Sequence, residues 1–223
     1  MIEVLNSGLY STIQDLGRFN YEGFGVPSSG NMDKFSSMLC NKLLKNNKND
    51  ALMEITMTGP KLLFKNRTTI SITGGNLSPK INGKLIEMNK VHHLFPEDIL
   101  SFGKLTYGYR SYLGVKGGFL TKRIMGSRSM YYPITENQKI NKGETLIVKK
   151  SKKKVSYENN YSFDYNQHFK EKTIYAFRGP EFDHLNKKQA INLTSSEFSI
   201  SNNNNRMAYQ SVSYTHLRAH ETG

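Results

Sequence analysis

Cysteine is almost absent from this chain, which has a single one, Cys40, among its 223 residues. One cysteine excludes an internal disulfide and fits a reducing compartment, so we expect a cytoplasmic location. The chain also lacks an apolar run near the roughly 18 residues that a membrane-spanning helix needs. Met1 leads straight into the strand-like residues 2–5 without a signal peptide. We therefore expect no membrane partner.

Several familiar motifs are missing as well. The sequence contains no phosphate-binding Walker motif, no dinucleotide-binding glycine fingerprint, no nucleophile elbow and no cluster of metal ligands. Residues 75–84 begin with a glycine and end with a Gly-Lys pair, as a Walker motif does. Their spacing differs from that of the Walker motif, and Leu85 stands where the motif requires Ser or Thr. We therefore predict no metal site. If the protein handles ATP, it does so by another architecture.

Acidic residues are few: 18 Asp and Glu stand against 31 Lys and Arg, which gives a net charge of +13. Such a charge is typical of nucleic-acid-binding proteins. Here, however, the basic residues are not interleaved with aromatic ones. The densest basic run, residues 149–154, follows a strand-like segment and precedes an Asn- and Tyr-rich stretch, as a solvated linker does. We therefore predict no nucleic-acid partner.

A helical period is clear in one segment, where apolar residues recur at steps of three and four. These residues are Met32, Phe35, Met38, Leu39 and Leu43. Ser29 or Asn31 can cap the start of this helix, and we expect it to end by residues 46–47. Cys40 lies within the helix, where we expect a small buried hydrophobic residue.

Short strand-like segments separated by turn residues make up most of the remainder. They are residues 51–57, 61–64, 69–73, 85–88, 99–102, 110–115 and 145–149. Asn82-Gly83 and Gly117-Gly118 mark tight turns. Many short strands with glycine turns predict a mainly β fold, a barrel or a sandwich, with one or two short helices.

The most informative stretch, residues 12–33, concentrates polar side chains in two short turns that also contain glycine. Its candidates for ligand binding are Gln14, Asp15, Arg18, Ser29 and Asp33. Arg18 can clamp a carboxylate or phosphate, and we expect it to face solvent, Asp15 and a bound anion. Gln14 can recognise an amide, and Asp15 can position Arg18 or act as a base. The alternative is an ordinary surface turn with a helix cap.

Two other regions supply candidates. Glu54 falls in an apolar strand, where a carboxylate is either a poised acid or a buried ion-pair partner. Arg128 lies in the motif GSRS and can clamp an anion. Ser29 and Asp33 precede the predicted helix, where an anion site and plain capping are both open.

These motifs stand in a fixed order: TIQDLGR (12–18), GVPSSGNMD (25–33), MEITMTGP (53–60), ITGGNLS (72–78), YLGVKGG (112–118) and GSRS (126–129). Over roughly residues 3–210, the chain resembles the carboxyltransferase-like family that includes the C component of 5-oxoprolinase, allophanate hydrolase subunit 2 and a kinase-inhibitor antagonist. Arg206 matches the last family block, which Asn205 and Ala208 degrade here. The resemblance implies cyclophilin-like β-barrel units. It also adds Arg206 to the substrate-binding candidates, with Asp15, Arg18 and Glu54 as the catalytic ones.

The resemblance implies three functions. The first is a subunit of an ATP-dependent 5-oxoprolinase, a hydrolase that uses ATP, with or without Mg²⁺, to open the cyclic amide 5-oxoproline to glutamate. Its partners would be a sister β-barrel subunit and a lactam hydrolase subunit. The second is biotin-dependent carboxyl transfer to urea or a similar amide. The third is a regulatory protein that binds a kinase inhibitor.

The domain organisation follows from composition and from this resemblance. We expect a β-rich unit over residues 1–150, a polar connector over 151–171 and an incomplete second unit over 172–210 with a helix near 181–191. Residues 211–223 resemble one reading frame of a transposase adapter used in DNA library preparation, so we expect them to be foreign. A chain truncated in this way is expected to be inactive alone.

Overall fold

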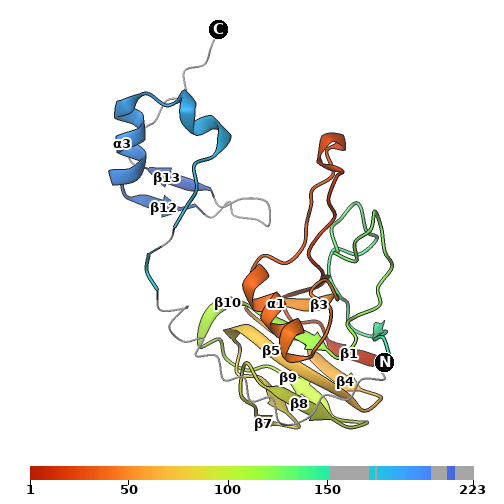
Figure 1. The fold of residues 1–223 in the computed structure, drawn as a ribbon. Helices are drawn as coiled ribbons and strands as arrows, with labels where there is room; N and C mark the ends of the chain where they lie inside the picture. Colours follow the sequence, from red (N-terminus) through yellow and green to blue (C-terminus); the bar gives the residue numbers. More distant parts are fainter. Residues whose placement is uncertain (151–170, 174, 202–209, 214–223) are drawn as a thin grey trace. The chain divides into compact units, whose positions relative to one another are not determined.

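The computed structural model describes residues 1–150, 171–173, 175–201 and 210–213. The chain divides into two compact units, Met1–Phe169 and Lys170–Gly223. The first unit is built from two antiparallel sheets, which confirms the mainly β fold (Figure 1).

The first sheet has the strand order β11-β1-β4-β9-β6-β7. Its strands are β1 (Ile2–Asn6), β4 (Lys61–Phe64), β6 (Lys80–Ile81), β7 (Lys84–Leu85), β9 (Ile99–Ser101) and β11 (Thr145–Leu146). The second sheet has the order β2-β3-β10-β5-β8. Its strands are β2 (Tyr10–Gln14), β3 (Leu52–Thr56), β5 (Thr68–Asn76), β8 (Val91–Leu94) and β10 (Tyr107–Val115).

The hydrophobic core lies between these two sheets. Side chains such as Val4 and Phe64 from the first sheet join Ile13, Ile55 and Leu113 from the second in one buried cluster. Because side chains alternate along a strand, the neighbours of Ile13, Thr12 and Gln14, point to the opposite face of the second sheet. That outer face, and not the core, carries most of the buried polar residues discussed below.

Helix α1 (Lys34–Leu43) packs on the outer face of the second sheet, against β5 and β10 (Figure 1). The helix was correctly predicted, but only Leu43 of its predicted apolar stripe lies on the buried face of the helix. Its buried residues are Ser36, Ser37, Cys40, Asn41 and Leu43. A Cβ on Gly114 of β10 would lie 2.7 Å from the Cys40 sulfur, so the helix approaches the sheet too closely for large side chains. Burial of Cys40 is confirmed, whereas Phe35 and Met38 of the apolar stripe are exposed.

The sequence-based boundaries differ from the structure in a few places. The residue at the N-terminal cap of α1 is Asp33, not Ser29 or Asn31, whereas the end of the helix at Leu43 agrees with the prediction. The first of the two turns predicted in residues 12–33 begins only after Gln14, because residues 12–14 belong to β2. The turn at Asn82-Gly83 is confirmed as the link between β6 and β7.

The second unit contributes η2 (Pro180–His184), α3 (Lys187–Ser195), β12 (Phe198–Ile200) and β13 (Ser211–Ser213). The helix expected near 181–191 is therefore a 3-10 turn followed by a separate helix. A capping box at Asn186 and Gln189 explains where α3 begins. β13, which opens the segment expected to be foreign, pairs antiparallel with β12. The connector over 151–171 lies almost entirely outside the described residues.

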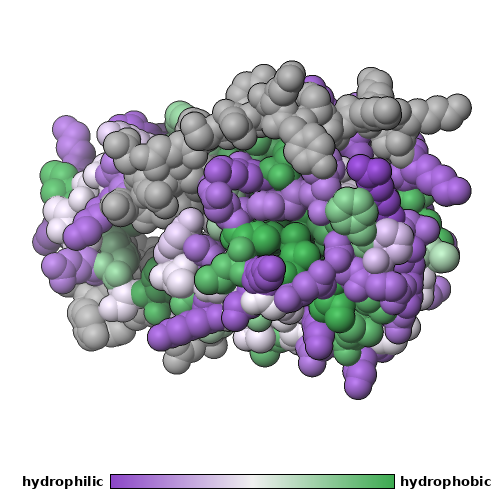
Figure 2. Space-filling model, turned by 90° about the horizontal axis from the view of Figure 1, so that it is seen from below, coloured by the Kyte–Doolittle hydropathy of each residue, from purple (hydrophilic) through white to green (hydrophobic). Residues whose placement is uncertain are grey.

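Apolar side chains also remain on the surface, among them Leu85 of β7 and Phe95 after β8. On the face that Figure 2 shows, hydrophobic groups gather among hydrophilic ones. Scattered exposed apolar residues of this kind are normal for a folded domain. Within the described parts of the chain, the helices are too short or too polar to cross a bilayer.

Candidate functional site

Polar side chains form a row across the outer face of the second sheet, under the start of α1. The strand register places Thr12 opposite Glu54, Glu54 opposite Tyr112, and Tyr112 opposite Thr73. All four side chains are buried. Burying polar groups is costly unless they are hydrogen-bonded, so this row has to be paired with the segment that covers it.

Glu54 and Tyr112 hold that segment in place. The Glu54 Oε2 atom accepts hydrogen bonds from the backbone N–H of Met32 at 2.9 Å and from the Tyr112 hydroxyl at 2.9 Å. The Tyr112 oxygen in turn accepts from the backbone N–H of Asp33 at 2.7 Å. Burial and the neighbouring Glu54 carboxylate raise the pKa of Tyr112, so its hydroxyl keeps the proton it donates. Arg110 forms an ion pair with Glu54, with its Nε atom 3.6 Å from the Glu54 Oε1 atom.

Asp15 is the centre of a second cluster, at the end of β2. Its Oδ1 atom accepts hydrogen bonds from the Gly17 backbone at 2.9 Å, the Ser127 hydroxyl at 2.6 Å and the Ser129 hydroxyl at 2.8 Å. Its Oδ2 atom accepts from the backbone N–H of Arg128 at 2.7 Å. These four hydrogen bonds occupy both carboxylate oxygens, and they tie residues 127–129 to the end of β2.

Arg18 is buried beside this carboxylate, with 1% of its surface exposed. Its Nη1 atom donates to the Ser29 hydroxyl at 2.8 Å and its Nη2 atom donates to the Ser129 carbonyl at 2.6 Å. Burial lowers the pKa of Arg18, while the Asp15 charge acts in the opposite direction. The expectation that Arg18 faces solvent is therefore wrong, because Ser29 and the Ser129 carbonyl occupy the space around it.

The segment of residues 28–33, which we call the bridging segment, lies between the two clusters. The Ser28 carbonyl accepts from the Arg18 backbone at 2.7 Å, and the Asn31 backbone donates to the Asp15 carbonyl at 3.0 Å. At Gly30, φ is +89° and a Cβ would lie 2.7 Å from the Leu16 carbonyl oxygen. The glycine thus permits a close backbone contact that other residues would prevent. Beyond it, Met32 and Asp33 bond to Glu54 and Tyr112.

Three buried polar atoms near this segment have no hydrogen-bond partner among the described residues. They are the Gln14 amide oxygen, the Asn31 amide oxygen and the Arg18 Nε atom. The Gln14 amide nitrogen is occupied, since it donates to Thr12 Oγ1 and to the Met130 carbonyl, both at 3.0 Å. Unpaired buried groups are rare and point to a missing water or ligand. Each of these two acceptors and this one donor can therefore pair with a water molecule or with a polar group of a ligand.

The candidate residues predicted from the sequence lie in distinct groups in the structure. Asp15, Arg18 and Ser29 lie together, and Glu54 lies on the other side of the bridging segment. Arg128 joins the Asp15 cluster only through its backbone, because its guanidinium bonds to the Thr121 carbonyl. Asp33 makes the hydrogen bonds of a helix cap, with Oδ1 accepting from the Ser36 N–H at 2.9 Å. Arg206 lies outside the described residues.

Sequence reasoning missed four contributors to these clusters. They are Ser127, Ser129, Arg110 and Tyr112. The two serines flank Arg128 in the GSRS motif, where the charge of the arginine is the more obvious signal. The sequence pattern around Tyr112 predicts only a strand. The signal that identifies Tyr112 is its position opposite Glu54, which requires the register of β3 and β10. Within the described residues, His, Cys, Asp and Glu form no group of three that could hold a metal ion.

Comparison with known proteins assigns the family. Residues 24–221 match the family model described as carboxyltransferase domain, subdomain A and B. This chain belongs to that carboxyltransferase-domain family. The match covers well over half of the chain. It includes the bridging segment, Glu54, Tyr112 and residues 127–129.

Relatives of known name fall into two groups. The chain is 42% identical over 130 residues to urea amidolyase of Lachancea kluyveri, which covers 58% of this chain and 7% of that protein. It is 24% identical over 214 residues to the C component of 5-oxoprolinase from Escherichia coli, which covers 94% of this chain and 68% of that protein. The chain thus spans a small part of the amidolyase and about two thirds of the 5-oxoprolinase component.

Solved structures show the same architecture. The urea amidolyase of K. lactis superimposes with a TM-score of 0.77 at 29% identity, covering 95% of this chain and 14% of that one. The urea carboxylase of Kluyveromyces lactis superimposes with a TM-score of 0.62 at 39% identity, covering 66% of this chain and 14% of that one. These likenesses show that the chain has the fold of carboxyltransferase-domain proteins.

Proposed function

We propose that this carboxyltransferase-domain protein is a subunit of an ATP-dependent 5-oxoprolinase, which opens 5-oxoproline to glutamate. The alignment with the C component of 5-oxoprolinase along 94% of the chain supports this assignment. ATP, with or without Mg²⁺, would be the cofactor. A sister β-barrel subunit and a lactam hydrolase subunit would be the partners, and the assembled enzyme would act on a small amide.

The observation that carries the proposal is the set of unpaired buried atoms beside the bridging segment. A cyclic amide presents one carbonyl acceptor and one N–H donor. The Arg18 Nε–H can donate to such a carbonyl, and the Gln14 amide oxygen can accept from such an N–H. Because these atoms are shielded from solvent, a ligand would reach them through a displacement of the bridging segment.

The same groups suit the activation of an amide by ATP. Transfer of a phosphoryl group to the amide oxygen makes the carbonyl carbon easier for water to attack. A guanidinium beside that oxygen would stabilise the negative charge that develops during transfer. The oxygens of Asp15 and Glu54 are already occupied by donors. We therefore propose positioning roles for these two carboxylates: Asp15 supports residues 127–129, and Glu54 supports the start of α1.

A second candidate function is carboxyl transfer from biotin to urea or a similar amide. It is favoured by the 42% identity to urea amidolyase and by the second unpaired acceptor, the Asn31 amide oxygen. Urea offers N–H donors on both sides of its carbonyl, so it can satisfy two acceptors and one donor together. Biotin would be the carboxyl donor in this case.

The test is turnover by the chain after it is mixed with its sister and lactam hydrolase partners. We expect ATP hydrolysis that depends on 5-oxoproline. Arg18→Lys keeps the charge but loses the planar fork, and we expect kcat to fall about a hundredfold, as when one transition-state donor is lost. Turnover is measured well below the melting temperature of the variant, because Arg18 also makes buried hydrogen bonds.

Arg123→Lys is the matched control, since Arg123 is exposed on the same segment as the GSRS motif. It should leave kcat unchanged. Wild-type turnover with Arg18→Lys would remove Arg18 from the site. Urea-dependent carboxyl transfer from biotin, without 5-oxoproline-dependent ATP hydrolysis, would establish the second function instead.

A further inference from the structure

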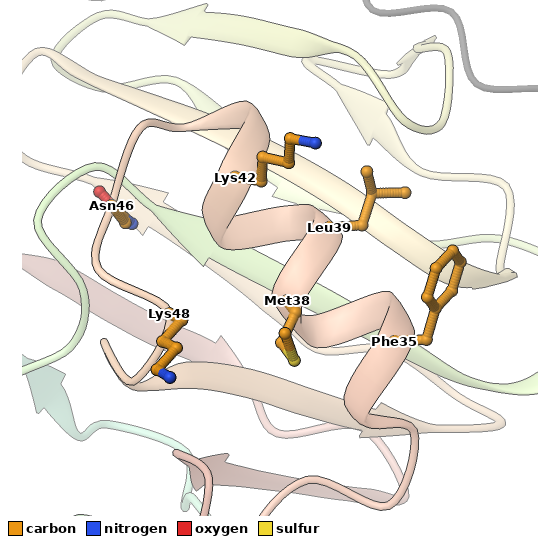
Figure 3. A pocket seen from close by; sticks show the side chains of 6 residues that line it. All are labelled: Phe35, Met38, Leu39, Lys42, Asn46 and Lys48. Atoms are coloured by element: carbon orange, nitrogen blue, oxygen red, sulfur yellow. The ribbon is translucent and has the colours of Figure 1, made fainter.

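Helix α1 exposes apolar side chains on the surface opposite the sheet. Phe35 is 48% exposed and Met38 is 43% exposed. Together with neighbouring residues they line a hollow of about 450 Å³ (Figure 3). We define the α1 outer face as Lys34, Phe35, Met38, Leu39, Lys42 and Lys48. Figure 3 shows Phe35, Met38, Leu39 and Lys42 projecting from α1, and Lys48 from the loop that follows it.

The charge on this face has one sign. The helix sequence KFSSMLCNKL contains no acidic residue. Lys34, Lys42 and Lys48 are exposed, and the ion pairs found in residues 1–150 involve none of them. Lys34 even lies at the helix N-terminus, where a positive charge opposes the helix dipole. An apolar centre with a purely cationic rim is complementary to an apolar segment that carries acidic residues.

Apart from two exposed lysines, the hollow has no free polar side chain among its lining residues that could orient a small ligand. Small-molecule sites combine apolar walls with a few placed polar groups. Asn46, the one uncharged polar residue in the lining, is already engaged. Its amide nitrogen donates to Asn41 Oδ1 at 3.1 Å and to the Val115 carbonyl at 2.9 Å, and its oxygen accepts from the Gly117 N–H at 2.9 Å. A side chain of another protein needs no such orienting group, because its own backbone fixes its position.

We propose that the α1 outer face is the docking surface for an acidic, apolar segment of the sister subunit. This inference rests on the proposed function only for the identity of the partner. Phe35, Met38 and Leu39 would receive an apolar anchor, and the lysines would pair with acidic residues around it. Two hydrogen bonds, from the Asp33 N–H to the Tyr112 hydroxyl and from the Thr73 hydroxyl to the Ser36 carbonyl, hold α1 on the sheet independently of that contact.

The test is the affinity of the full chain for the purified sister subunit, measured by calorimetry. We expect Met38→Glu to weaken binding about 30-fold, as loss of a central anchor does. Replacing Lys42 and Lys48 by Gln should weaken binding about fivefold at low salt, with a smaller effect near 0.5 M salt. Leu85→Glu is the matched control, since Leu85 is 68% exposed on β7 of the other sheet. It should bind as the wild type does.

Four results would overturn the proposal. They are unchanged binding by Met38→Glu, absence of binding by the wild-type chain, a homodimer that Met38→Glu dissociates, and a clear loss of thermal stability in the free Met38→Glu chain. The last would show that the face is covered within the chain itself. An active 5-oxoprolinase with unaffected Met38→Glu binding refutes the docking surface alone. A complex that needs the α1 outer face but lacks that activity refutes the proposed function alone.

Discussion

At the scale of single residues, Asp15 shows how one carboxylate can join two separate stretches of chain. It accepts hydrogen bonds from Gly17, from Arg128 and from two serine hydroxyls, and it lies near the buried Arg18. Asp15→Asn would remove the charge and turn one acceptor into a donor that faces other donors. We expect the free energy of unfolding to fall by about 3 kcal/mol.

Urea denaturation followed by circular dichroism measures this change. Glu87→Gln is a suitable control, because Glu87 forms an ion pair with Lys90 on the surface, at 2.5 Å. Its loss should change the free energy of unfolding far less, since exposed ion pairs are screened by solvent. Equal effects of the two substitutions would mean that the Asp15 hydrogen bonds add little to stability.

Cys40 gives a pH-dependent prediction. Burial raises the pKa of its thiol to about 12 from an ordinary value of 9.0. The folded state therefore favours the neutral thiol, and this contribution is complete below pH 9 and is lost as pH rises toward 12. Between pH 8 and pH 10 we expect the wild type to lose about 1 kcal/mol more stability than Cys40→Ala. Parallel pH profiles for the two proteins would contradict this.

At the scale of elements, the sequence predicted the positions of the helix and of most strands, which depend on local patterns. It did not predict which side chains face the sheet, because that depends on tertiary packing. The 3.6-residue period identified α1, and alternating apolar runs located most strands, because both patterns are local. The face of α1 that packs on the sheet is determined by its close approach to Gly114 in β10, which lies far away in sequence. The local pattern therefore could not show that the larger apolar residues point away from the sheet. For the same reason Asp15 and Arg18 were grouped correctly as neighbours, whereas the partners of Gln14, Asp15 and Arg18 at residues 127–130 were not found.

The bridging segment supplies a prediction at this scale. Gly30 has φ +89°, and an added Cβ would lie 2.7 Å from a backbone carbonyl oxygen. Gly126 has φ +77° but nothing within 4 Å of an added Cβ. Gly126→Ala should therefore cost about 1 kcal/mol from backbone strain alone, and Gly30→Ala about 3 kcal/mol from strain and the clash. Chemical denaturation of both variants compares them, and similar losses would show that the segment moves freely.

At the scale of the whole molecule, burial is distributed very unevenly between the two units. The hydrophobic core, from Ile2 to Leu146, lies wholly in the first unit. Among residues 171–173, 175–201 and 210, no side chain is buried. A unit gains cooperative stability mainly from buried apolar surface, so the two parts of the chain should behave differently when separated.

We therefore expect residues 1–150 expressed alone to melt in one cooperative transition, within about 3 °C of the whole chain. Residues 170–223 alone should show no such transition, because their described side chains, apolar ones such as Phe177 and Ile200 included, remain at least partly exposed to solvent. Differential scanning calorimetry of the two fragments and of the whole chain measures both outcomes. A large drop in the melting temperature of residues 1–150 would mean that the second unit stabilises the first.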